Sequence, residues 1–103
     1  MKLLLIMSIE EHASEVRKIL RDNGVAMYSE TDIHGFSTEQ HKPDISNWFA
    51  TETFKRFSKL FFSIQNKEAV ASVLDAVKEY NQVNSESKNY PLHAYQLNVE
   101  ASA

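Results

Sequence analysis

KLLLIM, residues 2–7, is an unbroken apolar run after its lysine. A strand at the centre of a sheet, covered on both faces, has this composition. The polar stretch SIEEH follows at residues 8–12 without the small-residue cleavage pattern of a secretory signal. We therefore interpret the run as a buried strand, and we expect it to lie centrally in its sheet.

Two amphipathic helices are predicted, over residues 10–23 and 66–80. Gly24 follows the first helix, at the position where helices commonly end on a glycine. Asn66 is a residue type that caps helix starts, and it precedes the second helix. The stripes expected to face a core are Ala13, Val16, Ile19 and Leu20 in the first helix and Val70, Val73, Leu74 and Val77 in the second.

Three further strands are predicted, over residues 25–36, 59–64 and 92–99, with a polar loop over 81–89 before the last. The order is strand, helix, strand, strand, helix, strand. Two interleaved right-handed crossovers then give an α+β, ferredoxin-like βαββαβ fold. Its four-stranded antiparallel sheet carries both helices on one face, and residues 1–103 form a single domain.

Alternation in the third predicted strand separates Phe61 from its apolar neighbours. Those neighbours, which share the opposite face, are Leu60, Phe62 and Ile64. We expect Phe61 on the sheet face without helices, where an aromatic side chain favours packing between subunits. The alternative is that Phe61 packs under the segment before it. In the last strand the residues that share a face are His93, Tyr95, Leu97 and Val99.

Composition restricts the possible functions. The 103 residues contain no cysteine, which excludes disulfides, thiolate metal sites and cysteine nucleophiles. The net charge of −3 gives no general attraction to nucleic acid or to an anionic membrane. Lys55, Arg56 and Lys59 come nearest to a basic patch, and we interpret them as a solvated face. No stretch approaches the roughly 20 apolar residues of a membrane span, so we expect a cytoplasmic protein that is not embedded in a membrane.

Residues 37–57 are too long for the two to five residues of an ordinary hairpin loop, and inserts of this length tend to be functional or disordered. They contain the only tryptophan, Trp48, beside Phe49. Exposed aromatic side chains near an arginine are typical of binding hot spots. We expect Trp48, Phe49, Phe54 and Arg56 to contact a partner protein. The alternative is that the aromatic side chains anchor this segment onto its own domain.

Gly24-Val25 after the first helix, and His34-Gly35-Phe36 before the long segment, resemble the PII signal-transduction family. In that family the second strand ends in a basic residue followed by Gly-Phe-Gly, and a long loop, the T-loop, comes next. Residues 37–57 are then T-loop-like. The resemblance implies a homotrimer that binds a small ligand in clefts between subunits and regulates a partner protein, with a membrane transporter among the candidates.

The resemblance also implies ligand-binding residues, namely His34, Gly35, Phe36, Ser37 and Glu39. Gly35 would offer its backbone to a nucleotide. Ser37 and Glu39 stand where the family has glycine and glutamine, and residues 81–91 lack the family's Gly-Asp-Gly-Lys phosphate loop. These departures argue against classical ATP and 2-oxoglutarate sensing. The sequence does not decide whether the cofactor is a nucleotide or a divalent metal ion.

A metal-binding protein, similar to CutA trimers or associated with metal efflux, is the alternative function. Its ligands would be His34, His41 and His93, because neutral imidazole is a common ligand of copper and zinc. Catalysis is not expected, since the sequence has no glycine-rich phosphate loop, nucleophile elbow or His-Glu-x-x-His motif.

Overall fold

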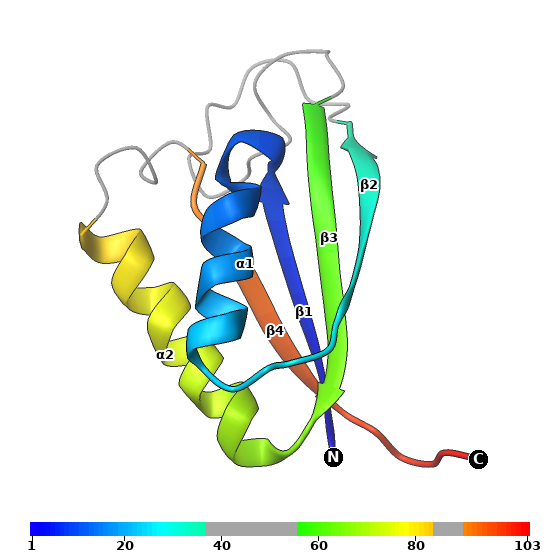
Figure 1. The fold of residues 1–103 in the computed structure, drawn as a ribbon. Helices are drawn as coiled ribbons and strands as arrows, with labels where there is room; N and C mark the ends of the chain where they lie inside the picture. The colour runs from blue at the N-terminus through cyan, green and yellow to red at the C-terminus, as the bar shows by residue number, and fades with distance from the viewer. Residues whose placement is uncertain (37–55, 84–89) are drawn as a thin grey trace.

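The computed structural model describes residues 1–36, 56–83 and 90–103. Four antiparallel strands form one sheet in the order β2-β3-β1-β4, and both helices lie on one of its faces (Figure 1). The predicted α+β, ferredoxin-like fold is therefore confirmed. The elements are β1 (Lys2–Ile9), the 3-10 turn η1 (Glu10–His12), α1 (Ala13–Asp22), β2 (Ser29–Gly35), β3 (Arg56–Gln65), α2 (Lys67–Val83) and β4 (His93–Asn98).

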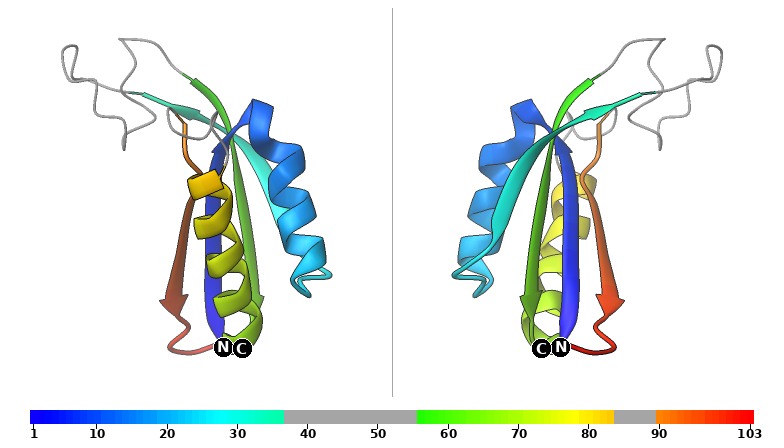
Figure 2. Two further views of the ribbon diagram at one scale, coloured as in Figure 1. Left: turned by 90° about the vertical axis from the view of Figure 1, so that its left-hand side faces the viewer. Right: turned by 90° about the vertical axis from the view of Figure 1, so that its right-hand side faces the viewer.

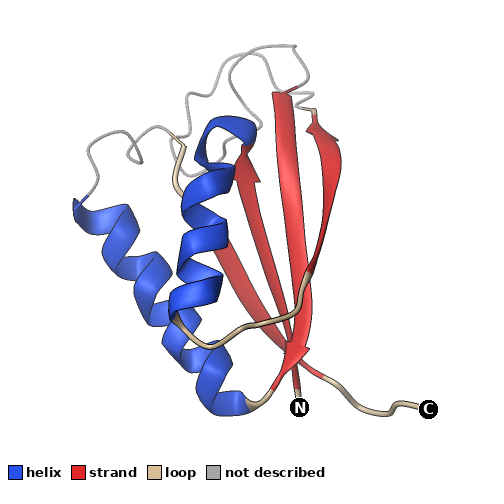
Figure 3. Ribbon diagram, in the orientation of Figure 1, coloured by secondary structure: helices blue, strands red, loops and turns tan. Residues whose placement is uncertain are grey.

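The core lies between the helices and the sheet (Figure 3). Both predicted helical stripes face it, with Ile19 and Leu74 partly buried and the other members buried. The buried core residues are Leu4, Ile6, Ala13, Val16, Leu20, Val25, Phe61, Val70, Val73, Val77 and Leu92. The burial of these apolar side chains is the main favourable term in folding a domain of this size.

Local signals end and begin the helices as predicted. Gly24 has a φ of 85°, which glycine adopts without steric cost, and the Val25 N–H donates to the Leu20 carbonyl at 2.9 Å. The Asn66 side-chain oxygen accepts from the Ala69 N–H at 2.8 Å, which caps α2. The turn at Gly24 directs the chain from α1 towards β2.

The faces of β3 are the reverse of those predicted. Phe61 pairs with Ile6 and faces the helices, where it is 1% exposed, so it does not lie on the open face. Leu60, Phe62 and Ile64 lie on the open face instead, as the strand register requires. Both faces of β3 carry large apolar side chains, so hydrophobic alternation gave no indication of which face is buried.

Pairing with β1 determines the faces of β3. Leu4 and Ile6 point towards the helices, whereas Leu3, Leu5 and Met7 are half-buried on the other face. The strand is central in the sheet, as predicted, but within one chain it is not covered on both faces. The sheet therefore has a second apolar face, and neither α1 nor α2 covers it.

Most element boundaries differ from the prediction. The first helix was predicted from Glu10, but residues 10–12 form the 3-10 turn and α1 begins at Ala13. β2 begins at Ser29, because the chain first crosses from Gly24 to the sheet edge, with Val25 buried in the core on the way. β3 begins at Arg56, so Arg56 and Phe57 belong to a strand and not to the long segment before it. α2 continues to Val83, past the predicted end near Tyr80.

The sheet face opposite the helices is open to the outside (Figure 2, right). Its apolar side chains come from β1, β3 and β4 and are aligned by the strand pairing. Four of them are between 39% and 50% exposed, namely Phe62, Ile64, Tyr95 and Leu97. We call these four residues, with the half-buried Leu3 and Leu5, the open-face patch. No helix in the described ranges is long and apolar enough to cross a membrane.

Candidate functional site

The site predicted from the sequence lies where β2 ends and β3 begins. Gly35 pairs with Arg56, and His34 pairs with Phe57. The His34 ring meets the Phe57 ring edge-on at 5.1 Å and the Phe36 ring at 6.5 Å. Gly35 is buried, whereas Phe36 is 64% exposed beyond the end of the strand. This end of the sheet thus presents an aromatic surface around a buried glycine.

The structure brings three of the predicted ligand-binding residues together, namely His34, Gly35 and Phe36. Ser37, Glu39, His41, Trp48, Phe49 and Phe54 lie outside the described residues. Arg56, predicted as a partner-binding residue, is the first residue of β3 and lies opposite Gly35. The β2–β3 pairing therefore places Arg56 in the same region as the predicted ligand-binding residues.

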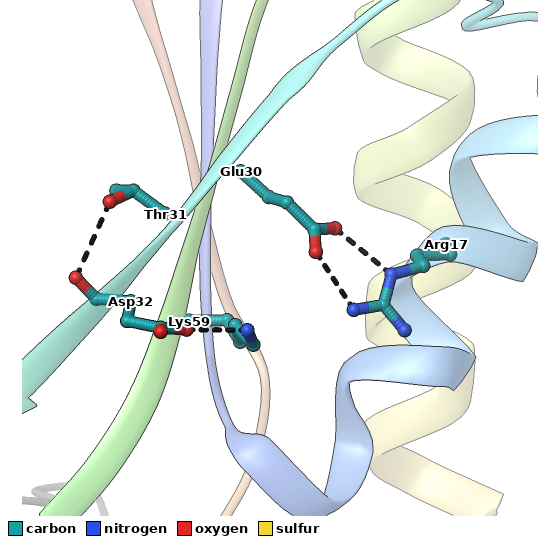
Figure 4. Close-up of polar contacts among 5 residues, drawn as sticks. All are labelled: Arg17, Glu30, Thr31, Asp32 and Lys59. Carbon is teal, nitrogen blue, oxygen red and sulfur yellow. Dashed lines mark hydrogen bonds and ion pairs between the residues drawn. The ribbon is translucent and has the colours of Figure 1, made fainter.

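Two ion pairs hold the edge strand β2 behind this site (Figure 4). The Arg17 guanidinium on α1 donates through Nε and Nη2 to the two carboxylate oxygens of Glu30, at 2.9 and 2.8 Å. The Lys59 ammonium on β3 donates to the Asp32 carboxylate. Glu30, Asp32 and His34 alternate along β2 on one face, so the strand that carries the site is tied to both α1 and β3.

These contacts shift the pKa values of all four charged groups in the two ion pairs. The hydrogen bond from Arg17 holds the pKa of Glu30 below its ordinary value, and that from Lys59 lowers the pKa of Asp32. The pKa values of Arg17 and Lys59 are raised by the same two hydrogen bonds. Every member is therefore charged at neutral pH. Lys59, interpreted from the sequence as part of a solvated face, has a side chain only 19% exposed and engaged in this pair.

Sequence reasoning did not identify this ion-pair network. The signal that was available is the period-two pattern Glu30-x-Asp32-x-His34, which puts three ionisable groups on one face of a strand. The cations that pair with Glu30 and Asp32 come from residues 13 positions earlier and 27 positions later in the chain, respectively. Only the fold brings these partners together.

Of the three proposed metal-binding histidines, the described part of the chain contains His34 and His93, which lie apart. His34 is on β2 and His93 on β4, the two edge strands of the sheet. The register also puts them on opposite faces, since His93 pairs with Met7 on the open side whereas His34 pairs with Phe57 on the helix side. Burial lowers the pKa of His93. Among the described residues no group of three or more His, Asp or Glu side chains is arranged to hold a metal ion.

Comparisons with solved structures identify the fold. The chain is similar to CPII, a nitrogen regulatory PII-like protein from Thiomonas intermedia K12 solved with ADP, AMP and bicarbonate. The TM-score is 0.60 at 14% identity, over 99% of this chain and 94% of that one. It is also similar to a putative PII-like signaling protein from Thermus thermophilus, with a TM-score of 0.58 at 17% identity, over 95% and 85%.

The apo form of CPII is similar as well, with a TM-score of 0.57 at 15% identity, over 93% of this chain and 89% of that one. No protein-family model matches the sequence. No curated protein matches it either. The fold is thus the PII-like form of the ferredoxin-like architecture, in agreement with the resemblance of the sequence around Gly35 and Phe36.

Proposed function

We propose that this chain is a PII-like regulatory protein, a homotrimer that binds a small ligand in clefts between its subunits and acts on a partner protein through residues 37–57. The observation that carries the proposal is the open-face patch in a chain of PII-like fold. A sheet face with several large apolar side chains left half-exposed is typical of an interaction surface.

The open-face patch supports assembly because its residues are adjacent across three strands. Leu5 lies between Phe62 and Tyr95, and Leu3 lies between Ile64 and Leu97. Packing against the same face of other copies would bury this apolar surface, which is the main source of free energy in association. Because both helices lie on the other face, they do not obstruct such an assembly (Figure 2).

The ligand site is proposed around the end of β2, at His34, Gly35 and Phe36, with Ser37 and Glu39 following. A buried glycine beside exposed aromatic rings offers backbone and stacking contacts to a nucleotide. ADP, AMP and bicarbonate were bound by CPII, and they are the first ligands to test here. The role is regulatory, since ligand binding would shift the population of conformations that the partner recognises.

Isothermal titration calorimetry tests the ligand site. We expect ADP or AMP to bind the wild-type protein, and Phe36→Ala to weaken that binding about tenfold, as the loss of one stacked ring would. The control is Lys67→Ala, an exposed truncation at the start of α2, at the opposite end of the sheet (Figure 1). If no heat of binding were measured with ADP, AMP or bicarbonate, the proposal that this site binds a nucleotide would be wrong. Equal weakening by both variants would move the site away from Phe36.

The partner contact is proposed at Trp48, Phe49 and Phe54, with Arg56. Affinity capture with immobilised wild-type protein identifies the partner, and Trp48→Ala then tests the contact. We expect the variant to lose most of the captured partner while its far-ultraviolet circular dichroism stays unchanged. Undiminished capture by Trp48→Ala would place the contact on another part of the chain.

A further inference from the structure

A basic groove lies on the helix side of the molecule, between α1 and the segment that leads from Gly24 to β2. Its volume is about 670 Å³, within the range of small-molecule sites. The residues that line it are Ser14, Arg17, Lys18, Arg21, Gly24, Val25, Ala26 and Tyr28. Four of these lie at positions 14, 17, 18 and 21, which is the spacing of one face of a helix.

The lining carries three cations and no carboxylate, and two of these cations are contacted from outside the lining, Arg17 by Glu30 and Arg21 by Asp22. The whole chain has a net charge of −3, with 11 Lys and Arg against 14 Asp and Glu, so this concentration of positive charge is not a property of the surface in general. The other wall is backbone and apolar or aromatic surface from Val25, Ala26 and Tyr28. The Tyr28 ring is fixed by packing against Phe61, at a ring separation of 6.1 Å.

The three cations retain free donors. Arg17 uses Nε and Nη2 for Glu30, which leaves Nη1 on the side of the guanidinium away from that carboxylate (Figure 4). Glu30 therefore fixes the Arg17 plane without using all of its donors. Within the described residues the Arg21 side chain is paired with its neighbour Asp22, through Nε at 3.2 Å, and it is 73% exposed. Lys18 has no ion-pair partner in the ranges that the structure describes.

We propose that this groove is a binding site for a small organic polyanion, held by Arg17, Lys18 and Arg21. Guanidinium groups bind phosphate and carboxylate oxygens through paired hydrogen bonds, and a lysine adds a mobile positive charge. The exposed Ala26 and the half-buried Tyr28 would contact the uncharged part of the ligand. Phosphate and carboxylate ligands share this chemistry, and two probes distinguish them.

The groove site does not depend on the proposed function. It lies wholly within one chain, on the helix side of the sheet, whereas the proposed subunit contacts use the open face. A monomer, or a protein that binds nothing at Gly35, would still have the groove. Its test can therefore fail or succeed independently of the test of the Gly35 site.

An NMR titration of the ¹⁵N-labelled full chain with pyrophosphate, and separately with citrate, tests this site. We expect saturable amide shifts confined to residues 14–28 with at least one probe, and weaker binding at higher salt. Stronger binding of pyrophosphate would identify a phosphate ligand, and stronger binding of citrate a carboxylate ligand. The double variant Lys18→Gln with Arg21→Gln should raise the dissociation constant about tenfold or more.

The matched control removes two positive charges from α2, by Lys67→Gln with Lys78→Gln, both at exposed positions outside the groove. It should change the dissociation constant by less than about twofold, since distant exposed charges are screened. If both double variants weakened binding of the probe equally, the effect would come from the net charge of the protein and not from the groove, and the proposal would be wrong. The absence of saturable shifts in residues 14–28 with both probes would also overturn it.

Discussion

The guanidinium of Arg17 and the carboxylate of Glu30 join α1 to the edge strand β2 through two parallel hydrogen bonds, of 2.9 and 2.8 Å. The same pair serves two regions of the molecule. On one side it steadies the strand that ends in His34 and Gly35, and on the other it orients a cation of the basic groove. A bidentate pair fixes geometry as well as charge, which suits this position between two candidate sites.

The Arg17–Glu30 pair should make a pH-dependent contribution to stability. The folded pKa of Glu30 lies below its ordinary value of 4.5. The contribution is therefore fully present above the unfolded pKa and is lost as the pH falls through the folded one. A double-mutant cycle with Arg17→Gln and Glu30→Gln should give a coupling of about 0.5–1 kcal/mol at pH 7, because both side chains are partly exposed.

Urea unfolding of the four proteins of this cycle measures that coupling. As the pH falls through the folded pKa of Glu30, the carboxylate becomes protonated and the coupling should approach zero. A coupling that stays constant from neutral to acid pH would show that the contact does not depend on the charge of Glu30.

Phe61 should be among the most stabilising side chains. It is 1% exposed between the sheet and the helices, so Phe61→Ala removes a large buried ring and leaves a cavity. We expect a loss of about 3–5 kcal/mol in the free energy of unfolding, measured in urea. Phe36→Ala, at a position 64% exposed, is the control and should cost under about 1 kcal/mol. If Phe61→Ala lowered the free energy of unfolding only slightly, the Phe61 ring would have to lie on the open face and not in the core.

Asn81 joins the end of α2 to the start of β4. Its amide nitrogen donates to the Leu92 carbonyl, and its oxygen accepts from the Leu92 N–H, both at 2.9 Å. Asn81→Ala would leave both backbone groups of the buried Leu92 without these bonds, and should cost about 2 kcal/mol. Hydrogen exchange at the Leu92 amide should accelerate in parallel. Unchanged exchange there would mean that Asn81 does not hold the last strand.

Much of the fold follows from local signals in the sequence. The helix stripes, the cap at Asn66 and the turn at Gly24 were all predicted, because each depends on residues within one or two turns of the chain. The orientation of β3 was not predictable in this way. Phe61 and Phe62 are adjacent and chemically identical, and the buried face of β3 also carries Ser63, whose hydroxyl donates to the Met27 carbonyl at 2.7 Å.

The candidate sites were predicted to different extents. His34, Gly35 and Phe36 are consecutive in the sequence, so a short motif was enough to propose them as ligand-binding residues, and this stays a prediction. The basic groove was missed because its cations at Arg17, Lys18 and Arg21 form the polar side of an amphipathic helix, which is usually a solvated face. The groove depends on the return of the chain over residues 24–28, and that path is set by tertiary packing.

Light scattering coupled to size-exclusion chromatography tests assembly through the open-face patch most directly. The wild-type protein should elute with a mass of three times the 11.8 kDa chain, and Phe62→Glu should elute at the mass of one chain, because it puts a charge at the centre of the apolar contact. A wild-type mass of 11.8 kDa at every concentration, or a Phe62→Glu variant that assembles as the wild type does, would contradict the account.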